Sequence, residues 1–183
     1  MNIIILVVNI LLVIVFIVMF NRLVRLRHLV KEAWSGIDVQ LKKRHDLIPN
    51  IVEAVKGYKE YEQKVHVDVT SLRSKIKNTS NNIQEKSRME NEFSQGLKNI
   101  FAVAEAYPDL KSNKVFLDLH KTLVAVEDDL QMARRYYNGT VRDLNIMVES
   151  FPVNLIAGMF NICSLDYFEI QFATERQVPD VKM

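Results

Sequence analysis

The pattern of apolar and polar positions divides the chain into two parts. Residues 1–20 carry no charged side chain, and their polar side chains are those of Asn2 and Asn9. As a helix, residues 3–20 would be about 27 Å long, close to the ~30 Å thickness of the hydrocarbon core of a bilayer. From residue 21 onward, charged residues are interleaved with apolar ones. The pattern therefore predicts a transmembrane anchor at 1–20, followed by a helical domain.

Apolar residues recur at steps of three and four through that domain, which is the spacing of one face of an α-helix. Four helices are predicted in 21–150, over about 21–45, 47–77, 81–106 and 109–150. The spacing is clearest in the last of them, at Phe116, Leu119, Leu123, Val126, Leu130, Ala133, Tyr137, Thr140, Leu144 and Met147. Because only short turns join the segments, neighbouring helices should be antiparallel. The predicted fold is all-α, with an N-terminal transmembrane helix followed by a long antiparallel four-helix bundle.

Prolines and polar residues suggest where these helices end. Asp46 followed by Pro49 is typical of a helix start, so we expect a break or sharp bend at His45–Asp46. The turn at 78–82 is polar, and Pro108 and Pro152 follow the third and fourth helices. The tail, 151–183, begins with an apolar stretch that should pack on the bundle or on a partner.

Composition excludes several alternatives. Five glycines and four prolines in 183 residues are too few for a turn-rich β-fold, and 49% hydrophobic residues exclude a disordered chain. The formal net charge of +2 gives no general footprint for nucleic-acid binding.

Basic residues follow the apolar segment at Arg22, Arg25, Arg27 and Lys31. The positive-inside rule then places the N-terminus outside and the helical domain in the cytoplasm. A cleaved signal peptide is the main alternative, but no basic region precedes the segment and no small-residue cleavage site follows it. The same cluster could hold anionic lipid head groups, at roughly 1 kcal/mol per basic residue. The simpler interpretation is that it only determines topology.

Two charge runs in the domain are interpreted as solvated helix faces. They are Lys42-Lys43-Arg44 and Glu127-Asp128-Asp129, and the second could pair with Arg134 or Arg135. Arg134, Arg135 and Tyr136 lie beside the apolar seam and form a candidate partner face. Within the anchor, Asn9 could hydrogen-bond to another span.

The residues that could carry chemistry are few. The four histidines form no HxxxH pair, and Cys163 has no second cysteine with which to bind a metal. A lone cysteine in an apolar tail is expected to be a small buried hydrophobe. No phosphate-binding glycine loop is present. We therefore assign no catalytic, cofactor or metal residue and no small-molecule substrate.

Four segments resemble the LemA family. They are AWSGIDVQLKKRHDLIPNIVEAVKGY (33–58), AEAYPDLKSNKVFLDLH (104–120), EDDLQMARRYYNGTVRDLN (127–145) and FPVNLIAGMF (151–160). The resemblance implies a bacterial single-pass membrane protein with a long antiparallel four-helix bundle. It also implies no established catalytic activity or cofactor, and one lineage of the family is linked to magnetosome membranes. It supplies no active site to carry over.

Three functional hypotheses follow. The first is a non-enzymatic, membrane-anchored scaffold or adaptor at the bacterial inner membrane, which self-associates or recruits a membrane-protein partner. The alternative is an accessory or signalling subunit of a membrane complex, for example with a membrane protease or sensor. A hydrolytic enzyme comes third, because it would require His45, His120 or Cys163 to converge with acidic groups.

Overall fold

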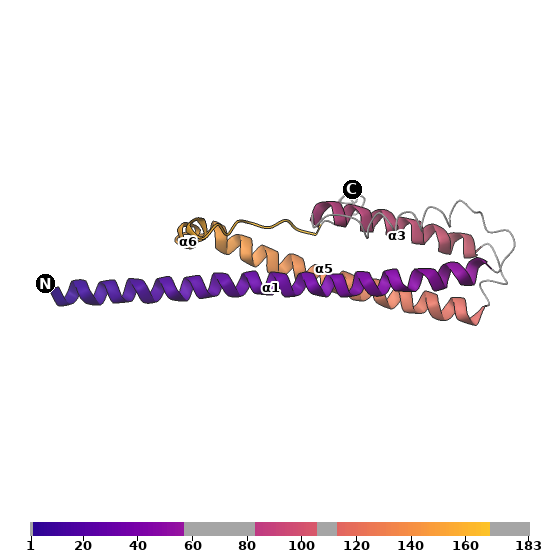
Figure 1. The fold of residues 1–183 in the computed structure, drawn as a ribbon, viewed down its shortest axis with the longest axis horizontal. Coiled ribbons are helices and arrows are strands. Elements are labelled where there is room, and N and C mark those ends of the chain that lie inside the picture. Colours follow the sequence, from indigo (N-terminus) through magenta and orange to yellow (C-terminus); the bar gives the residue numbers. More distant parts are fainter. Residues whose placement is uncertain (1, 57–82, 106–112, 169–183) are drawn as a thin grey trace, which may run out of the picture. The chain divides into compact units, whose positions relative to one another are not determined.

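The computed structural model describes residues 2–56, 83–105 and 113–168, and every regular element in these ranges is a helix (Figure 1). The elements are α1 (Asn2–Lys56), α3 (Ile83–Glu105), α5 (Lys114–Glu149) and α6 (Val153–Met159). An extended segment follows α6 to residue 168. The prediction of an all-α protein is confirmed for these ranges. Most of the helix expected over 47–77 lies outside the described residues, so the antiparallel four-helix arrangement stays a prediction.

Helix α1 does not break at His45–Asp46, and that prediction is wrong. The helix continues from Asn2 to Lys56 with Pro49 inside it. A proline in a helix interior costs about 3 kcal/mol, because it removes one backbone hydrogen bond and crowds the preceding turn. Pro49 is exposed, whereas Ile48 and Ile51 beside it are buried. The apolar seam therefore continues through the proline, and burial on that seam offsets the cost.

The described chain forms two compact units. The first combines Met1–Val39 with Gln131–Tyr167. In this unit Trp34 packs against Tyr137, and Phe20 packs against Phe160. Met19 and Arg22, earlier on α1, line a groove with Met147 near the end of α5, so α1 and α5 run in opposite directions. Its core consists of Leu23, Val30, Ala33 and Ile37 from α1, Tyr137, Val141 and Leu144 from α5, Val153, Ile156 and Ala157 from α6, and Ile162.

The second unit combines Gln40–Leu130 with Phe168–Met183. Its described core consists of Leu41, Ile48, Ile51 and Val52 from α1, Phe93 and Leu97 from α3, and Phe116, Leu123, Val126 and Leu130 from α5, with Phe168. On α5, the predicted seam is confirmed in both units: its members are buried, except for three that are half-buried. Periodicity was therefore a sound guide to which side of α5 packs.

Helix α5 begins later than predicted because Asn113 caps it. The Asn113 side-chain oxygen accepts hydrogen bonds from the backbone N–H groups of Val115 (2.9 Å) and Phe116 (3.2 Å). Those groups have no partner within the helix, so a side-chain acceptor at this position stabilises its first turn.

Replacing Asn113 with alanine is expected to lower the free energy of unfolding by about 1 kcal/mol. Asn113→Asp is the matched control, because its carboxylate accepts the same two bonds. Urea denaturation of the full chain in detergent, followed by far-UV circular dichroism, measures both. Equal losses for the two variants would show that the cap is not the stabilising feature.

Candidate functional site

A buried arginine organises the polar contacts of the second unit. Arg44 is 0% exposed, and its Nη1 donates to Ser94 Oγ (2.8 Å) and to Glu127 Oε1 (2.9 Å). Its Nη2 donates to the backbone oxygen of Glu90 (3.4 Å) and forms a short ion pair with Glu90 Oε2. Ser94 Oγ donates in turn to the Glu90 backbone oxygen at 3.0 Å. One side chain of α1 thus binds α3 and α5 together.

Aromatic and imidazole groups complete this cluster. The Arg44 guanidinium lies 4.9 Å from the centre of the fully buried Phe93 ring, a cation–π arrangement. The His45 ring meets the same phenylalanine edge-on at 5.1 Å, and His45 Nε2 lies 3.2 Å from Glu90 Oε1. Glu90, like Arg44, is fully buried. Its carboxylate thus faces Arg44 through Oε2 and His45 through Oε1.

The cluster corrects two interpretations of the sequence. Lys42 and Lys43 are exposed as expected, but Arg44 in the same run is buried. Glu127 was expected to be solvated or to pair with Arg134 or Arg135, and it accepts from Arg44 instead. None of the three residues that bind Arg44, which are Glu90, Ser94 and Glu127, is near it in sequence, so the helical pattern alone gave no signal for this burial.

In the first unit, polar side chains of α5 hold the segment that follows α6. The Asn145 amide donates to the backbone oxygen of Leu165 and accepts from its N–H, both at 2.9 Å. The Tyr137 hydroxyl donates to the Asp166 backbone oxygen (3.0 Å), and Ser164 Oγ donates to Glu149 Oε1 (3.0 Å). The chain around 164–166 is therefore fixed along α5 through backbone-directed bonds.

The environment of Tyr137 changes its acidity. Its side chain is 1% exposed and its ring meets Trp34 edge-on at 5.4 Å. Burial, followed by the negative charge of Asp166, raises the pKa of Tyr137 from 10.0 to about 12. The hydroxyl thus stays protonated as a hydrogen-bond donor, which suits a structural clamp and not a general base.

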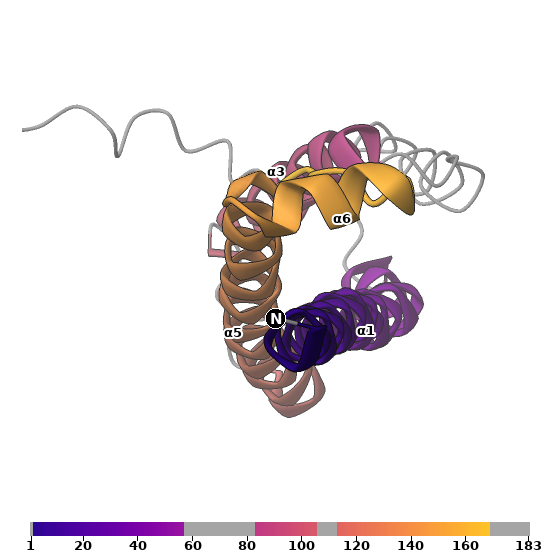
Figure 2. The same ribbon diagram turned by 90° about the vertical axis from the view of Figure 1, so that its left-hand side faces the viewer.

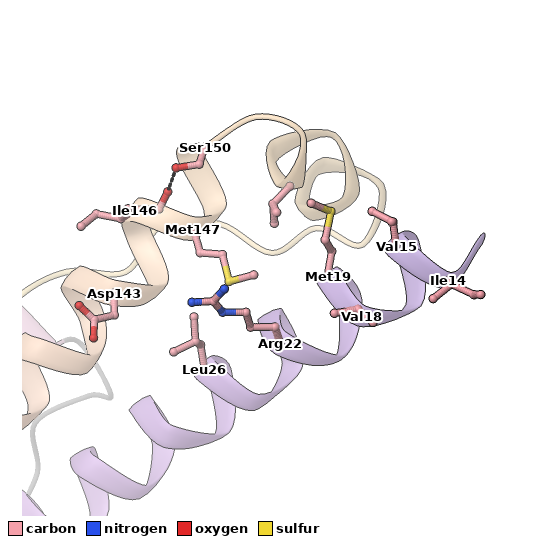
Figure 3. A pocket seen from close by; sticks show the side chains of 11 residues that line it. Ile14, Val15, Val18, Met19, Arg22, Leu26, Asp143, Ile146, Met147 and Ser150 are labelled. Atoms are coloured by element: carbon pink, nitrogen blue, oxygen red, sulfur yellow. Dashed lines mark hydrogen bonds between the residues drawn. The ribbon is translucent and has the colours of Figure 1, made fainter. Parts of the chain in front are cut away.

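An open groove of about 660 Å³ lies between α1, the end of α5 and the start of α6 in the first unit (Figure 3). Most of the residues that line the groove are apolar. The lining residues are Ile14, Val15, Val18, Met19, Arg22, Leu26, Asp143, Ile146, Met147, Ser150 and Val153. Figure 3 shows the Arg22 side chain extending towards Met147, between the two helices. The groove therefore continues from the predicted span into the charged region after it.

The structure places the remaining predicted site residues as follows. The side chains of the four basic residues after the span are exposed: Arg22, Arg25, Arg27 and Lys31. Arg22 lines the groove. In the predicted partner face, Arg135 and Tyr136 are exposed, but Arg134 is buried at 6% exposure. Arg134 thus packs inside and offers no outward contact, because it lies on the core side of α5.

Asn9 is exposed on α1, and its amide donates to the Ile5 backbone oxygen one turn earlier (2.9 Å). Cys163 is exposed and reduced, so the expectation that it is buried is wrong. It belongs to the first unit, whereas His45 and His120 belong to the second. Within the described residues, no group of three or more His, Cys, Asp or Glu side chains is placed to hold a metal ion.

The comparisons with known proteins decide the family. The LemA family matches the sequence over residues 33–183, most of the chain. The chain belongs to the LemA family. It is 24% identical to Protein LemA of Metamycoplasma hominis over 149 residues, which cover 81% of this chain and 68% of that protein. It is also 29% identical over 77 residues to the magnetosome proteins MamQ 1 and MamQ 2 of Paramagnetospirillum magneticum, covering 42% of this chain but only 28% of each of them.

The LemA match includes most of the features described above. The Arg44 cluster, the Tyr137 and Asn145 contacts and α6 all lie between residues 33 and 183. The apolar segment and the basic residues that follow it, through Lys31, precede the match. The first part of α1 is nevertheless long and apolar enough to cross a membrane, and none of that stretch is buried in the structure. The membrane assignment of this LemA protein therefore rests on its own sequence and on α1.

Proposed function

We propose that this LemA protein is a non-enzymatic, membrane-anchored scaffold that self-associates through the outward face of α5. The observation that carries the proposal is a row of exposed apolar side chains in the first unit. Met132, Tyr136 and Ile146 are 59%, 52% and 58% exposed. Together with Gly139 and the exposed, charged Asp143, they follow the three-and-four spacing of one helix face, and Ile146 also lines the groove. Solvent-exposed apolar side chains that share a face are typical of an interaction surface.

The chemistry of this face suits packing against a second helix. Tyrosine, methionine and arginine are enriched at protein interfaces, and Arg135 is exposed next to Tyr136. At Gly139 no atom lies within 4 Å of where a Cβ would stand, so a partner helix has room to approach. An identical face on a second copy would provide a matching apolar surface, as in an isologous dimer.

Crosslinking in native membranes tests self-association. Single cysteines at Met132, Tyr136 or Ile146, in a Cys163→Ser background, are treated with a short bis-maleimide. We expect covalent dimers from these positions and few from Ser35→Cys, an exposed polar position on α1 in the same unit. Linkage at none of the three α5 positions, or equal linkage at Ser35, would contradict the proposal.

The anchor also defines a topology for this scaffold. We place the N-terminus outside and the helices that follow the anchor on the cytoplasmic side, because the exposed basic residues follow the apolar segment. Retention of the segment as an uncleaved anchor is part of the proposal.

Thiol labelling tests this topology. In the Cys163→Ser background, Asn2→Cys should react with a membrane-impermeant maleimide on intact cells, or on spheroplasts where an outer membrane is present. Ser35→Cys should react only after permeabilisation. Labelling of Ser35→Cys from outside would reverse the assignment.

An accessory or signalling role in a membrane complex is the second candidate. Asn9 is the feature that favours it, since an amide in a span can hydrogen-bond to another span for about 1 kcal/mol. The bond from Asn9 to Ile5 already satisfies one amide donor within α1. The Asn9 side chain therefore needs a second span less to satisfy its hydrogen bonds, and we rank this role below the scaffold.

A further inference from the structure

The segment around α6 has an unusual composition for a surface element. From 150 to 165 the sequence is SFPVNLIAGMFNICSL, without an acidic or basic residue. Val153, Ile156 and Ala157 are buried against the first unit. The opposite side, which also includes exposed Asn154 and Gly158, is largely apolar: Phe151, Leu155 and Met159, four residues apart, are 80%, 61% and 74% exposed. A helix that is apolar on both sides needs a non-aqueous environment for its outer side.

Contacts with α1 determine the level of α6 along the anchor. The Phe160 ring, just after α6, packs on Phe20 with ring centres 4.6 Å apart. Val153, the first residue of α6, lines the groove together with Val15 and Val18. At 1.5 Å per residue, the distance from Phe20 back to Val15 is about 7.5 Å along the helix. The helix α6 thus lies beside the last turns of the apolar segment, 3–20.

The direction of α6 is informative as well. Figure 1 shows α6 nearly end-on while α1 extends across the view, and Figure 2 shows α6 along its length while α1 is seen from its end. Within the first unit, α6 therefore runs across α1. If α1 crosses a bilayer, α6 lies in the plane of that bilayer, as interfacial helices do.

We propose that α6 and its flanks form a second membrane contact, with Phe151, Leu155 and Met159 embedded among lipid acyl chains of the cytoplasmic leaflet. The occupant follows from continuity: a bilayer that surrounds the anchor up to Phe20 also reaches α6, which is held against Val15 to Phe20. If the hydrocarbon region ends near Phe20, contacts between Phe20 and Val15 lie within about 7.5 Å of that boundary, and interfacial helices typically lie about 5–10 Å deep. The proposal depends on α1 being a membrane anchor with the topology given above, and on nothing else in the proposed function.

The anchor and α6 would then contact the bilayer at two places and hold the first unit in one orientation. The anchor alone leaves the protein free to rotate about α1, whereas α6 adds an apolar surface displaced to one side. The tail is bound to α5 by Asn145 and Tyr137, so the position of α6 is transmitted to α5. The membrane would thereby orient the face of α5 that carries Met132 and Tyr136.

Quenching of tryptophan fluorescence by brominated lipids tests the proposal. All reporter variants carry Trp34→Phe, which removes the single natural tryptophan and keeps an aromatic ring next to Tyr137. Reporters are Leu155→Trp and Met159→Trp on α6, Leu12→Trp in the anchor, and Met132→Trp on α5. The full chain is reconstituted in vesicles of phosphatidylcholine and phosphatidylglycerol, with and without bromine atoms on the acyl chains.

We expect the α6 reporters to lose fluorescence to an extent comparable to Leu12→Trp, with blue-shifted emission, and Met132→Trp to keep its intensity. If Leu12→Trp is quenched and both α6 reporters are not, the anchor is intact but the inference is wrong. If the α6 reporters are protected both from brominated lipid and from the aqueous quencher acrylamide, a protein partner covers α6, and the inference is again wrong. If Leu12→Trp itself escapes quenching, the anchor of the proposed function fails, and the inference fails with it.

Discussion

Replacing Arg44 with methionine is expected to lower the free energy of unfolding by about 3–5 kcal/mol, the usual result of removing one partner of a buried ion pair. The substitution leaves Glu90 fully buried without its guanidinium, and it removes donors from Ser94 and Glu127. A carboxylate without compensating charge in such a site is far more costly than the lost packing of one side chain. Urea denaturation of the full chain in detergent measures the change.

The same helix offers a matched control. Glu92 lies two residues from Glu90, and it pairs with Arg88 at 3.9 Å, with both side chains more than half exposed. Glu92→Gln should change the free energy of unfolding by less than about 0.5 kcal/mol, whereas Glu90→Gln should cost several-fold more. Similar effects at both positions would show that Glu90 is not part of a buried ionic network.

A double substitution separates charge burial from packing. Arg44→Met combined with Glu90→Leu removes both charges and fills the space with apolar groups, which is often neutral or stabilising relative to the ion pair. We expect the double variant to be more stable than Arg44→Met alone. If it is less stable, the two charges do not compensate each other, and the lost stability comes from packing.

What the sequence could predict was set by local periodicity. The steps of three and four along α5 reflect which side of the helix faces a core, and burial follows those steps at Phe116, Leu123, Leu130 and Leu144. The apolar helix at the N-terminus was equally easy to predict, because a continuous apolar stretch is recognised without knowledge of its partners. Family membership followed from strings of neighbouring residues and is confirmed by the LemA match.

What the sequence could not predict depends on partners distant along the chain. Arg44 is a surface residue by type and becomes internal because Glu90 and Glu127 meet it from two other helices. Pro49 was given its usual meaning as a helix start, but the buried seam on both sides of it outweighs that preference. The Asn113 cap had a recognisable residue type, although an earlier start near Pro108 was equally compatible with the pattern.

The candidate surfaces show the same limit. Arg134 and Tyr136 are close in sequence, yet only the second faces outward, because α5 is packed on a side that includes Arg134. The outward row through Met132 and Ile146 could be derived only once the buried side of α5 was known. Likewise, the apolar tail was recognised as unsuited to water, but its position beside Phe20 needed the contact with Phe160.

Two adjacent tyrosines are expected to respond very differently to truncation. Tyr137→Ala should lower the free energy of unfolding by about 3–5 kcal/mol, because it empties a fully packed site next to Trp34. Tyr136→Ala, at a 52% exposed position, should cost less than about 0.5 kcal/mol and instead reduce crosslinking through the α5 face. Loss of stability of the same size at both positions would contradict the assignment of one tyrosine to the core and one to the surface.

The hydroxyl of Tyr137 also makes stability depend on alkaline pH. Burial and the charge of Asp166 raise its pKa from 10.0 to about 12 in the folded protein. Between those values the unfolded chain loses the phenolic proton and the folded protein keeps it, so the free energy of unfolding falls as pH rises. The stability that depends on the protonated hydroxyl is fully present below pH 10.

Tyr137→Phe removes this pH dependence. It also removes the hydrogen bond to the Asp166 backbone oxygen, which lowers the free energy of unfolding by about 1 kcal/mol at neutral pH. Denaturation at pH values from 8 to above 11 should therefore show the variant losing less stability than the parent, and parallel profiles would mean that Tyr137 titrates alike in both states.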